Sequence, residues 1–258
     1  MTAVQVHAVV EGPAGAPVLL LSNSLGADLA MWDPQVPALT EHFRVVRYDM
    51  RGHGRSPVPP GDSTIDDLAD DVIALLDRLD VAQVHLAGVS LGGMTALRLA
   101  ARDPQRVATL AVLCSSAHPG NEQGWQGRAA TVRAEGPGAI ADAVISRWLT
   151  PEFAAAHPDV IGRLRATFAA HPDEGYARCC SVLAGLDLRP DLGRIVAPTL
   201  VVSGAEDQAL PPEHQHVIAD GVPGARLLTL SPAAHLANIE QAGRVTDALI
   251  AHATGGTR

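Results

Sequence analysis

The sequence contains no lysine, because all 19 of its basic residues are arginine. Schiff-base chemistry on a lysine side chain is therefore excluded. Cysteine is also scarce: the three cysteines have neither an even number nor the spacing of metal ligands. The neighbours Cys179 and Cys180 are expected to be core thiols rather than a strained disulfide. No metal-binding or cofactor-binding motif is found, so we expect neither a metal nor a cofactor.

Long apolar runs are absent, and no basic residues precede an apolar stretch at the N-terminus. We therefore expect neither a membrane span nor a secretory signal, and we predict a cytoplasmic protein. A formal net charge of −9 argues against nucleic acid as a partner. It also means that an anionic substrate needs a local arginine to offset the overall field. The sequence does not distinguish a monomer from a homo-oligomer.

Short apolar runs alternate with helical patterns along the chain. The hydrophobic content of 47% and the length of 258 residues fit one large globular domain with an insertion. Alternation of this kind predicts a mostly parallel, doubly wound α/β sheet with helices on both faces. Helices are expected over Thr64–Leu79, Leu91–Ala101 and Val245–His252. The expected strands are Val4–Val10, Pro17–Ser22, Phe43–Tyr48, Gln83–Ala87, Ala108–Leu113, Thr199–Ser203 and Arg226–Leu230.

Residues 118–188 interrupt this alternation. They contain no convincing strand, and helical segments are separated by dipeptides such as Gly136-Pro137 and His157-Pro158. We interpret this stretch as a helical cap inserted into the sheet domain, which would occupy residues 1–117 and 189–258. Caps of this kind close over a site and exclude water, so we expect this one to shape the substrate pocket.

Gly88-Val89-Ser90-Leu91-Gly92 lies between an expected strand and an expected helix. A serine at such a sharp turn has strained backbone angles, and small neighbours let the flanking segments approach closely. The turn places the hydroxyl beside the first turn of the helix, where N–H groups stabilise a developing oxyanion. The pattern therefore predicts that Ser90 is a nucleophile.

A nucleophilic serine needs a base, and the base needs an orienting acid. The chain order of an α/β hydrolase is serine, acid, histidine. Asp207 follows the expected strand Thr199–Ser203, and carboxyl ends of parallel strands carry such sites. It is favoured over its neighbour Glu206 as a shorter side chain four residues past the strand. His235 follows the last expected strand and is the predicted base. The competing histidines are His214 and His216, expected to face solvent, and His53, which precedes the serine.

The oxyanion site needs two N–H groups. The residue after the nucleophile, Leu91, supplies one. The second is expected in the loop Ser22–Gly26, which follows an early strand, and Leu25 is the candidate. Ser24 can hydrogen-bond a ligand or act as an ordinary turn residue.

Several segments of the chain match the motifs of one known enzyme family. These segments are Ser22–Gly26, Met31–Gln35, Arg47–Gly54, Arg147–Phe153, Gly175–Cys180 and Ala234–Gln241. Together, over almost the whole chain, they resemble the 3-oxoadipate enol-lactonases of the α/β-hydrolase superfamily. R-G-H-G and G-x-S-x-G are general to α/β hydrolases, whereas N-S-L-G, R-W-x-T-P-E-F and G-Y-A-x-C-C are more discriminating. The resemblance implies an α/β-hydrolase fold and hydrolysis of 3-oxoadipate enol-lactone in the β-ketoadipate pathway of protocatechuate and catechol degradation.

A small anionic lactone is thus the expected partner of this chain. Because the substrate carries a carboxylate and the chain is net negative, a cation must face the pocket. Arg128 and Arg133 in the expected cap are candidates, with Trp125 and Trp148 as apolar walls.

Two alternatives remain open. One is another carboxylesterase or lactonase, or a haloperoxidase-like hydrolase, on the same three residues. The other is a hydrolase-fold receptor that binds a ligand without turning it over.

Overall fold

The computed structural model describes residues 3–255, and its strands form a seven-stranded sheet. The strand order is β1-β3-β2-β4-β5-β6-β7. β1 runs antiparallel to β3, and the other neighbouring strands are parallel. The strands are β1 (Ala8–Glu11), β2 (Val18–Ser22), β3 (Arg44–Tyr48), β4 (Val84–Val89), β5 (Val107–Leu113), β6 (Thr199–Gly204) and β7 (Arg226–Leu230).

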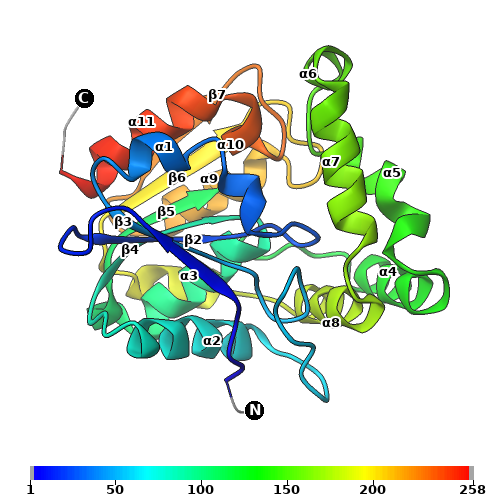
Figure 1. The fold of residues 1–258 in the computed structure, drawn as a ribbon, viewed down its shortest axis with the longest axis horizontal. Coiled ribbons are helices and arrows are strands. Elements are labelled where there is room, and N and C mark those ends of the chain that lie inside the picture. Colours follow the sequence, from blue (N-terminus) through cyan, green and yellow to red (C-terminus); the bar gives the residue numbers. More distant parts are fainter. Residues whose placement is uncertain (1–2, 256–258) are drawn as a thin grey trace.

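Helices cover both faces of this sheet. Figure 1 shows α2 and α3 on one face and α1 and α11 on the other. The predicted mostly parallel, doubly wound α/β fold is therefore confirmed. The helices that flank the sheet are α1 (Val36–Leu39), α2 (Ile65–Arg78), α3 (Leu91–Arg102), α9 (Pro212–Gly221), α10 (Ala237–Glu240) and α11 (Ala242–Ala253).

Local sequence explains where α2 begins. The Thr64 hydroxyl accepts a hydrogen bond from the Asp67 N–H at 3.2 Å, and the Asp67 carboxylate accepts one from the Thr64 N–H at 2.8 Å. This reciprocal capping box satisfies two donors that the first turn leaves without partners.

Within residues 3–255, none of the helices combines the length and the apolar character that a membrane crossing requires.

The first strand is shorter than the sequence predicts. We expected Val4–Val10, whereas β1 covers Ala8–Glu11. The preceding amides bond to side chains: the Val4 N–H donates to Asp71 at 2.7 Å, and the His7 N–H donates to Ser56 at 2.8 Å. Apolar patterning alone does not reveal such side-chain partners for the backbone.

Five helices between β5 and β6 form a separate group, which we call the helical layer. Figure 1 shows it beside the carboxyl ends of the strands, with α4 packed along α8. The chain enters and leaves this layer at one place, since the Leu188 N–H donates to the Ala117 carbonyl at 2.7 Å. Its helices are α4 (Glu122–Glu135), α5 (Ala141–Ile145), α6 (Pro151–Ala156), α7 (Pro158–Ala169) and α8 (Asp173–Ala184).

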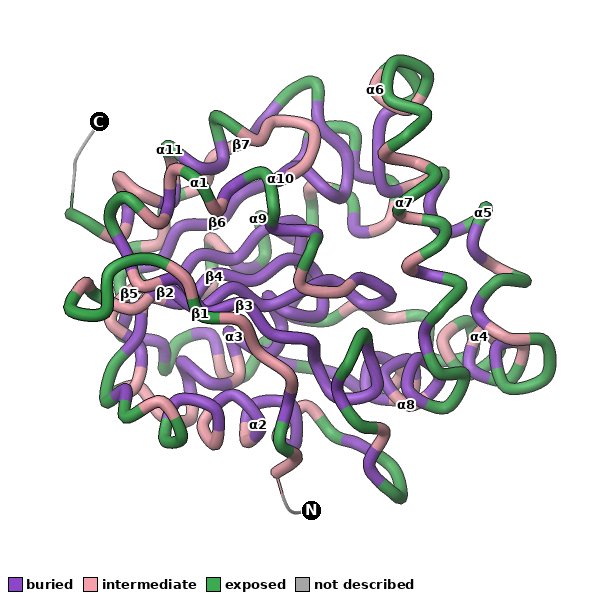
Figure 2. The backbone as a smooth tube through the Cα atoms, viewed as in Figure 1, coloured by how far each residue is buried: buried purple, intermediate pink, exposed green. Residues whose placement is uncertain are grey.

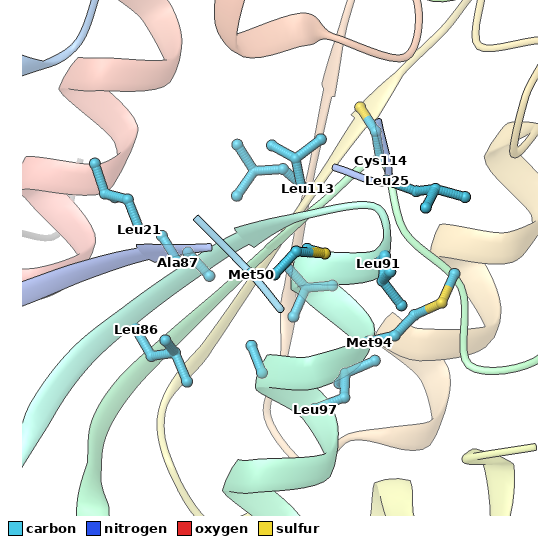
Figure 3. Close-up of a cluster of buried hydrophobic side chains, with 14 of the residues drawn as sticks. Leu21, Leu25, Met50, Leu86, Ala87, Leu91, Met94, Leu97, Leu113 and Cys114 are labelled. Atoms are coloured by element: carbon cyan, nitrogen blue, oxygen red, sulfur yellow. The ribbon is translucent and has the colours of Figure 1, made fainter. Parts of the chain in front are cut away.

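The core follows the central strands. Figure 2 shows these strands buried, while exposed residues gather on the outer helices such as α6 and α7. Cys114, Cys179 and Cys180 are free and buried, as expected of core thiols. Figure 3 shows one apolar cluster in which Leu25 and Leu91 lie together with residues of β4, β5 and α3. The two residues expected to supply oxyanion donors, Leu25 and Leu91, thus have side chains buried in the core.

Candidate active site

Ser90 occupies the turn between β4 and α3. Its backbone has φ 56° and ψ −119°, a conformation that costs energy in any residue except glycine. The Ser90 N–H donates to the Leu113 carbonyl at 3.0 Å. The Ser90 carbonyl accepts from the Ser115 hydroxyl at 2.7 Å and from the Met94 N–H at 3.0 Å. Hydrogen bonds from two adjacent elements therefore fix the strained turn.

The two glycines of the turn let β4 and α3 pack closely. A Cβ on Gly88 would lie 2.3 Å from the Gly92 carbonyl oxygen. A Cβ on Gly92 would lie 2.4 Å from the carbonyl oxygen of Ser22, at the end of β2. Both separations are far below van der Waals contact, so these positions require glycine. This is the structural context that the G-x-S-x-G motif needs.

Asp207 and His235 form a buried hydrogen-bonded pair. The His235 Nδ1 lies 2.8 Å from an Asp207 carboxylate oxygen, and the two side chains are 3% and 0% exposed. The other carboxylate oxygen accepts from the N–H groups of Ala209 at 2.8 Å and Leu210 at 3.0 Å. These bonds orient the carboxylate, and the carboxylate holds the imidazole with its Nε2 as the remaining proton acceptor.

Glu206, the competing carboxylate, has a different role. It accepts from the Ser231 hydroxyl and from the Ala233 N–H, both at 2.7 Å, and so braces the turn after β7. The competing His214 bonds to the Ser116 hydroxyl at 2.8 Å, and His216 is exposed on α9. The structure therefore pairs Asp207 with His235, whereas Glu206, His214 and His216 do not take part in this pair.

A cavity of about 160 Å³ lies between the sheet domain and the helical layer. Drug-sized ligands occupy pockets of roughly 300–1,000 Å³, so this space fits a smaller molecule. Ser90 and His235 both line it, which places the predicted nucleophile and the predicted base on one surface. Of the other predicted site residues, the cavity is lined by Ser24, Leu25, Trp125, Arg128 and Trp148.

Two arginines of the helical layer line the cavity. Arg128 lies on α4 with its guanidinium carbon 4.7 Å from the centre of the Trp125 ring, and it donates to the Tyr176 hydroxyl at 3.4 Å. Arg147 lies in the turn after α5. Burial lowers the pKa of Arg147, and the charge of Arg128 lowers that pKa further. The cavity wall thus carries two cations that repel each other.

Arg133, the other predicted arginine, is not among the residues that line this cavity. It pairs with Glu174 at 3.0 Å on the outer side of the helical layer. Arg147 and Tyr176 also line the cavity, although the sequence analysis does not predict them there. The available signal was position: Arg147 adjoins the predicted wall residue Trp148.

The oxyanion candidates are suitably placed. Leu25 lines the cavity, and Leu91 is the first residue of α3, where backbone N–H groups have no partner within the helix. Among residues 3–255, neither of these two amides donates a hydrogen bond to a protein acceptor.

The loop that carries His235 is hydrogen-bonded to the helical layer at the cavity wall, since the Leu236 N–H donates to the Trp148 carbonyl at 2.8 Å.

Comparison with known proteins agrees with this geometry. A family model described as the alpha/beta hydrolase fold matches residues 17–242. The "3-oxoadipate enol-lactonase 2" of Acinetobacter baylyi is 40% identical over 230 residues, covering 89% of this chain and 86% of the relative. The crystal structure of the enol-lactonase from Burkholderia xenovorans LB400 has a TM-score of 0.94 and 41% identity, covering 96% of both chains.

A third similar protein is a thermophilic esterase from Thermogutta terrifontis, solved with malate bound. Its TM-score is 0.89 at 33% identity, covering 95% of this chain and 91% of the esterase. Fold, site and relatives together define the class: the chain belongs to the α/β hydrolase family and is a carboxylic-ester hydrolase. The motifs of the chain predict a resemblance to 3-oxoadipate enol-lactonases. These relatives confirm it.

Proposed function

We propose that this hydrolase opens 3-oxoadipate enol-lactone to 3-oxoadipate through an acyl-enzyme on Ser90. One observation carries the proposal: the cavity that holds Ser90 and His235 is also lined by Arg128 and Arg147, and neither arginine forms an ion pair with a carboxylate in residues 3–255. The site therefore combines ester-cleaving groups with a place for a free carboxylate. Similarity to proteins named enol-lactonase supports the same substrate.

The first half of the reaction forms the acyl-enzyme. The Ser90 Oγ attacks the lactone carbonyl while its proton passes to the His235 Nε2, and Asp207 stabilises the resulting imidazolium. The carbonyl oxygen becomes an oxyanion held by the N–H groups of Leu25 and Leu91. One such donor contributes about 10²–10³-fold to the rate.

Collapse of the tetrahedral intermediate breaks the ring ester bond. The leaving oxygen departs as an enolate, which is less basic than an alkoxide, so its expulsion needs less acid assistance. The His235 imidazolium gives its proton to this oxygen and becomes neutral again, and the resulting enol tautomerises to the ketone. Water then attacks the acyl-enzyme with His235 again as base, and the free acid leaves as Ser90 is regenerated. A positioned base of this kind contributes roughly 10²–10⁴-fold.

The remaining cavity residues would orient the lactone. Arg128 and Arg147 would hold its carboxylate, since a guanidinium matches a carboxylate with paired N–H donors. Trp125 and Trp148 would form the apolar walls, and Ser24 would supply a hydroxyl at the entrance to the oxyanion site. The esterase from Thermogutta terrifontis was solved with malate bound, so a similar hydrolase binds a small carboxylate.

The helical layer would act as the cap of the enzyme. We place its boundaries at residues 118 and 188, supported by the hydrogen bond between Leu188 and Ala117 that joins its two ends. A role in the β-ketoadipate pathway follows from the names of the similar proteins. A cytoplasmic location is supported by three free thiols, which are typical of a reducing compartment.

The test is the loss of ultraviolet absorbance of freshly generated 3-oxoadipate enol-lactone, with wild type beside Ser90→Ala. The variant supplies the rate of spontaneous hydrolysis. We expect wild-type turnover far above this background and far better than on p-nitrophenyl acetate. Equal traces from the two proteins, with p-nitrophenyl acetate still cleaved by wild type, would refute the substrate but not the hydrolase. A wild type that binds the lactone and cleaves neither compound would indicate a receptor.

A further inference from the structure

The proposed mechanism gives no role to His53, one of the buried histidines of the chain. His53 lies in the loop after β3 and is fully buried. Its Nε2 accepts a hydrogen bond from the Gly26 N–H at 3.1 Å, and its Nδ1 faces the Arg51 carbonyl at 3.2 Å. Because Nε2 accepts and a carbonyl can only accept, the ring is neutral with its proton on Nδ1. Every hydrogen-bonding atom of the imidazole is thus used.

The peptide that His53 holds is next to the oxyanion site. Gly26 directly follows Leu25, which lines the cavity, so only the φ and ψ angles of Leu25 separate the fixed peptide from the peptide that carries the Leu25 N–H. Gly26 has φ 79°, and a Cβ there would lie 2.5 Å from the Phe168 ring. The loop is therefore packed against the helical layer on one side and bonded to His53 on the other.

The surroundings keep His53 in its accepting form. The ring of His171, from the helical layer, lies 4.7 Å from that of His53, and the His171 Nδ1 accepts from the Gly54 N–H at 3.2 Å. Burial, with the additional effect of His171, lowers the pKa of His53 to about 3. At neutral pH the imidazole thus carries no proton on Nε2 that would repel the Gly26 N–H.

We propose that His53 is a positioning residue for the oxyanion site: by accepting the Gly26 N–H, it fixes the direction of the Leu25 N–H toward the reacting carbonyl. This inference rests on the proposed function, because it needs an oxyanion to stabilise. It concerns every ester that the enzyme cleaves, whether charged or neutral. Loss of alignment by about 1 Å can cost on the order of 10²-fold in rate.

His53→Gln and His53→Asn introduce side chains that differ by one methylene. Comparing them distinguishes a role of His53 as hydrogen-bond acceptor from a role in packing alone. In His53→Gln the amide oxygen can reach the position of Nε2, whereas in His53→Asn it falls short. We expect His53→Asn to lower kcat by about 10- to 100-fold with little change in KM. We expect His53→Gln to recover most of that loss. A boronic acid, which forms a tetrahedral adduct with the serine, should bind more weakly to His53→Asn by a similar factor.

The measurements are made on both the enol-lactone and p-nitrophenyl acetate. Equal kcat in wild type and His53→Asn, a loss confined to KM, or a His53→Gln variant as impaired as His53→Asn would overturn the inference. Should His53→Asn not fold, as judged by circular dichroism, the same comparison is made with His53→Leu, which fills the space without an acceptor. If wild type cleaves p-nitrophenyl acetate but not the lactone, the proposed substrate fails while the role of His53 is still decided.

Discussion

Arg128 on α4 and Arg147 in the turn after α5 line one cavity, and burial together with the charge of Arg128 lowers the pKa of Arg147. Other arginines of the helical layer have carboxylate partners: Arg133 pairs with Glu174, and Arg165 pairs with Asp142. In the part of the chain that the structure describes, no carboxylate lies within ion-pair distance of the two cavity arginines. A carboxylate entering the cavity would relieve their repulsion and supply the missing partner.

Substitution of either cavity arginine should therefore affect charged substrates selectively. We expect Arg147→Ala and Arg128→Ala each to raise KM for the enol-lactone by about 10- to 100-fold, since a hydrogen bond to a charged group contributes about 1.5–3 kcal/mol. Hydrolysis of p-nitrophenyl acetate, which has no carboxylate, should change little. Arg133→Ala is the control, because Arg133 pairs outside the cavity. Parallel losses on both substrates would show that the arginines do not bind the carboxylate.

The two neighbouring carboxylates after β6 should respond very differently to loss of charge. Asp207→Asn removes the acceptor that orients His235, and we expect kcat to fall by about 10⁴-fold with the fold intact. Glu206→Gln keeps most of its hydrogen-bonding capacity in the turn and should leave kcat close to wild type. Steady-state kinetics of the two variants decides between them. A larger loss from Glu206→Gln would reverse the assignment of the acid.

The glycine of the serine turn should not tolerate a side chain. In Gly88→Ala the new Cβ would lie 2.3 Å from a backbone oxygen that cannot move without displacing α3. We expect a loss of about 1–3 kcal/mol in the free energy of unfolding, as is typical of overpacking, together with loss of esterase activity. Gly127→Ala on exposed α4 has nothing within 4 Å and should be neutral or stabilising. Urea denaturation of both variants measures the difference.

The buried His53 should make the folded state sensitive to acid. Its pKa is lowered to about 3 in the folded chain, whereas an unfolded histidine titrates near about 6.5. Between these values the unfolded state binds one proton more, so the stability present above about pH 6.5 is lost as the pH falls toward 3. This histidine should contribute about 1.4 kcal/mol per pH unit to that loss in the middle of the range.

The test compares the pH dependence of the free energy of unfolding for wild type and His53→Gln between pH 6 and pH 4. The variant should have a shallower slope, because glutamine does not titrate. His216→Gln, on the exposed surface of α9, is the matched control. Identical slopes for wild type and His53→Gln would mean that the buried imidazole is protonated in the folded state as readily as in the unfolded state.

Much of the fold and part of the site could be predicted from sequence because the relevant signals are local. The turn around Ser90 needs a strand, two glycines and a helix within a few residues, and the predicted strand–turn–helix agrees with the structure. Chain order and strand ends were sufficient to bring Asp207 and His235 together as predicted. Their catalytic roles, with that of Ser90, remain predictions that the experiments above address.

Features that depend on the packing of helices could not be predicted in the same way. Arg133 lies on α4 and Arg147 in the turn after α5, and only the way α4 packs along α8 places Arg133 beside Glu174 and away from the cavity. The chain order disfavours His53 as the catalytic base, because it precedes Ser90, and so gives it no other role. Its bond to Gly26 joins two loops that are 27 residues apart, and no local pattern marks such a contact.

The hydrogen bond between Leu188 and Ala117 has an evolutionary consequence. The chain leaves the sheet domain at Ala117 and returns to it at Leu188, and these two residues lie side by side in space. An insertion of different length or sequence can therefore replace the helical layer without separating β5 from β6. The strands would continue to present Ser90, Asp207 and His235, while a new insertion would bring different walls and different charges. Substrate range and chemistry can therefore diverge independently along this chain.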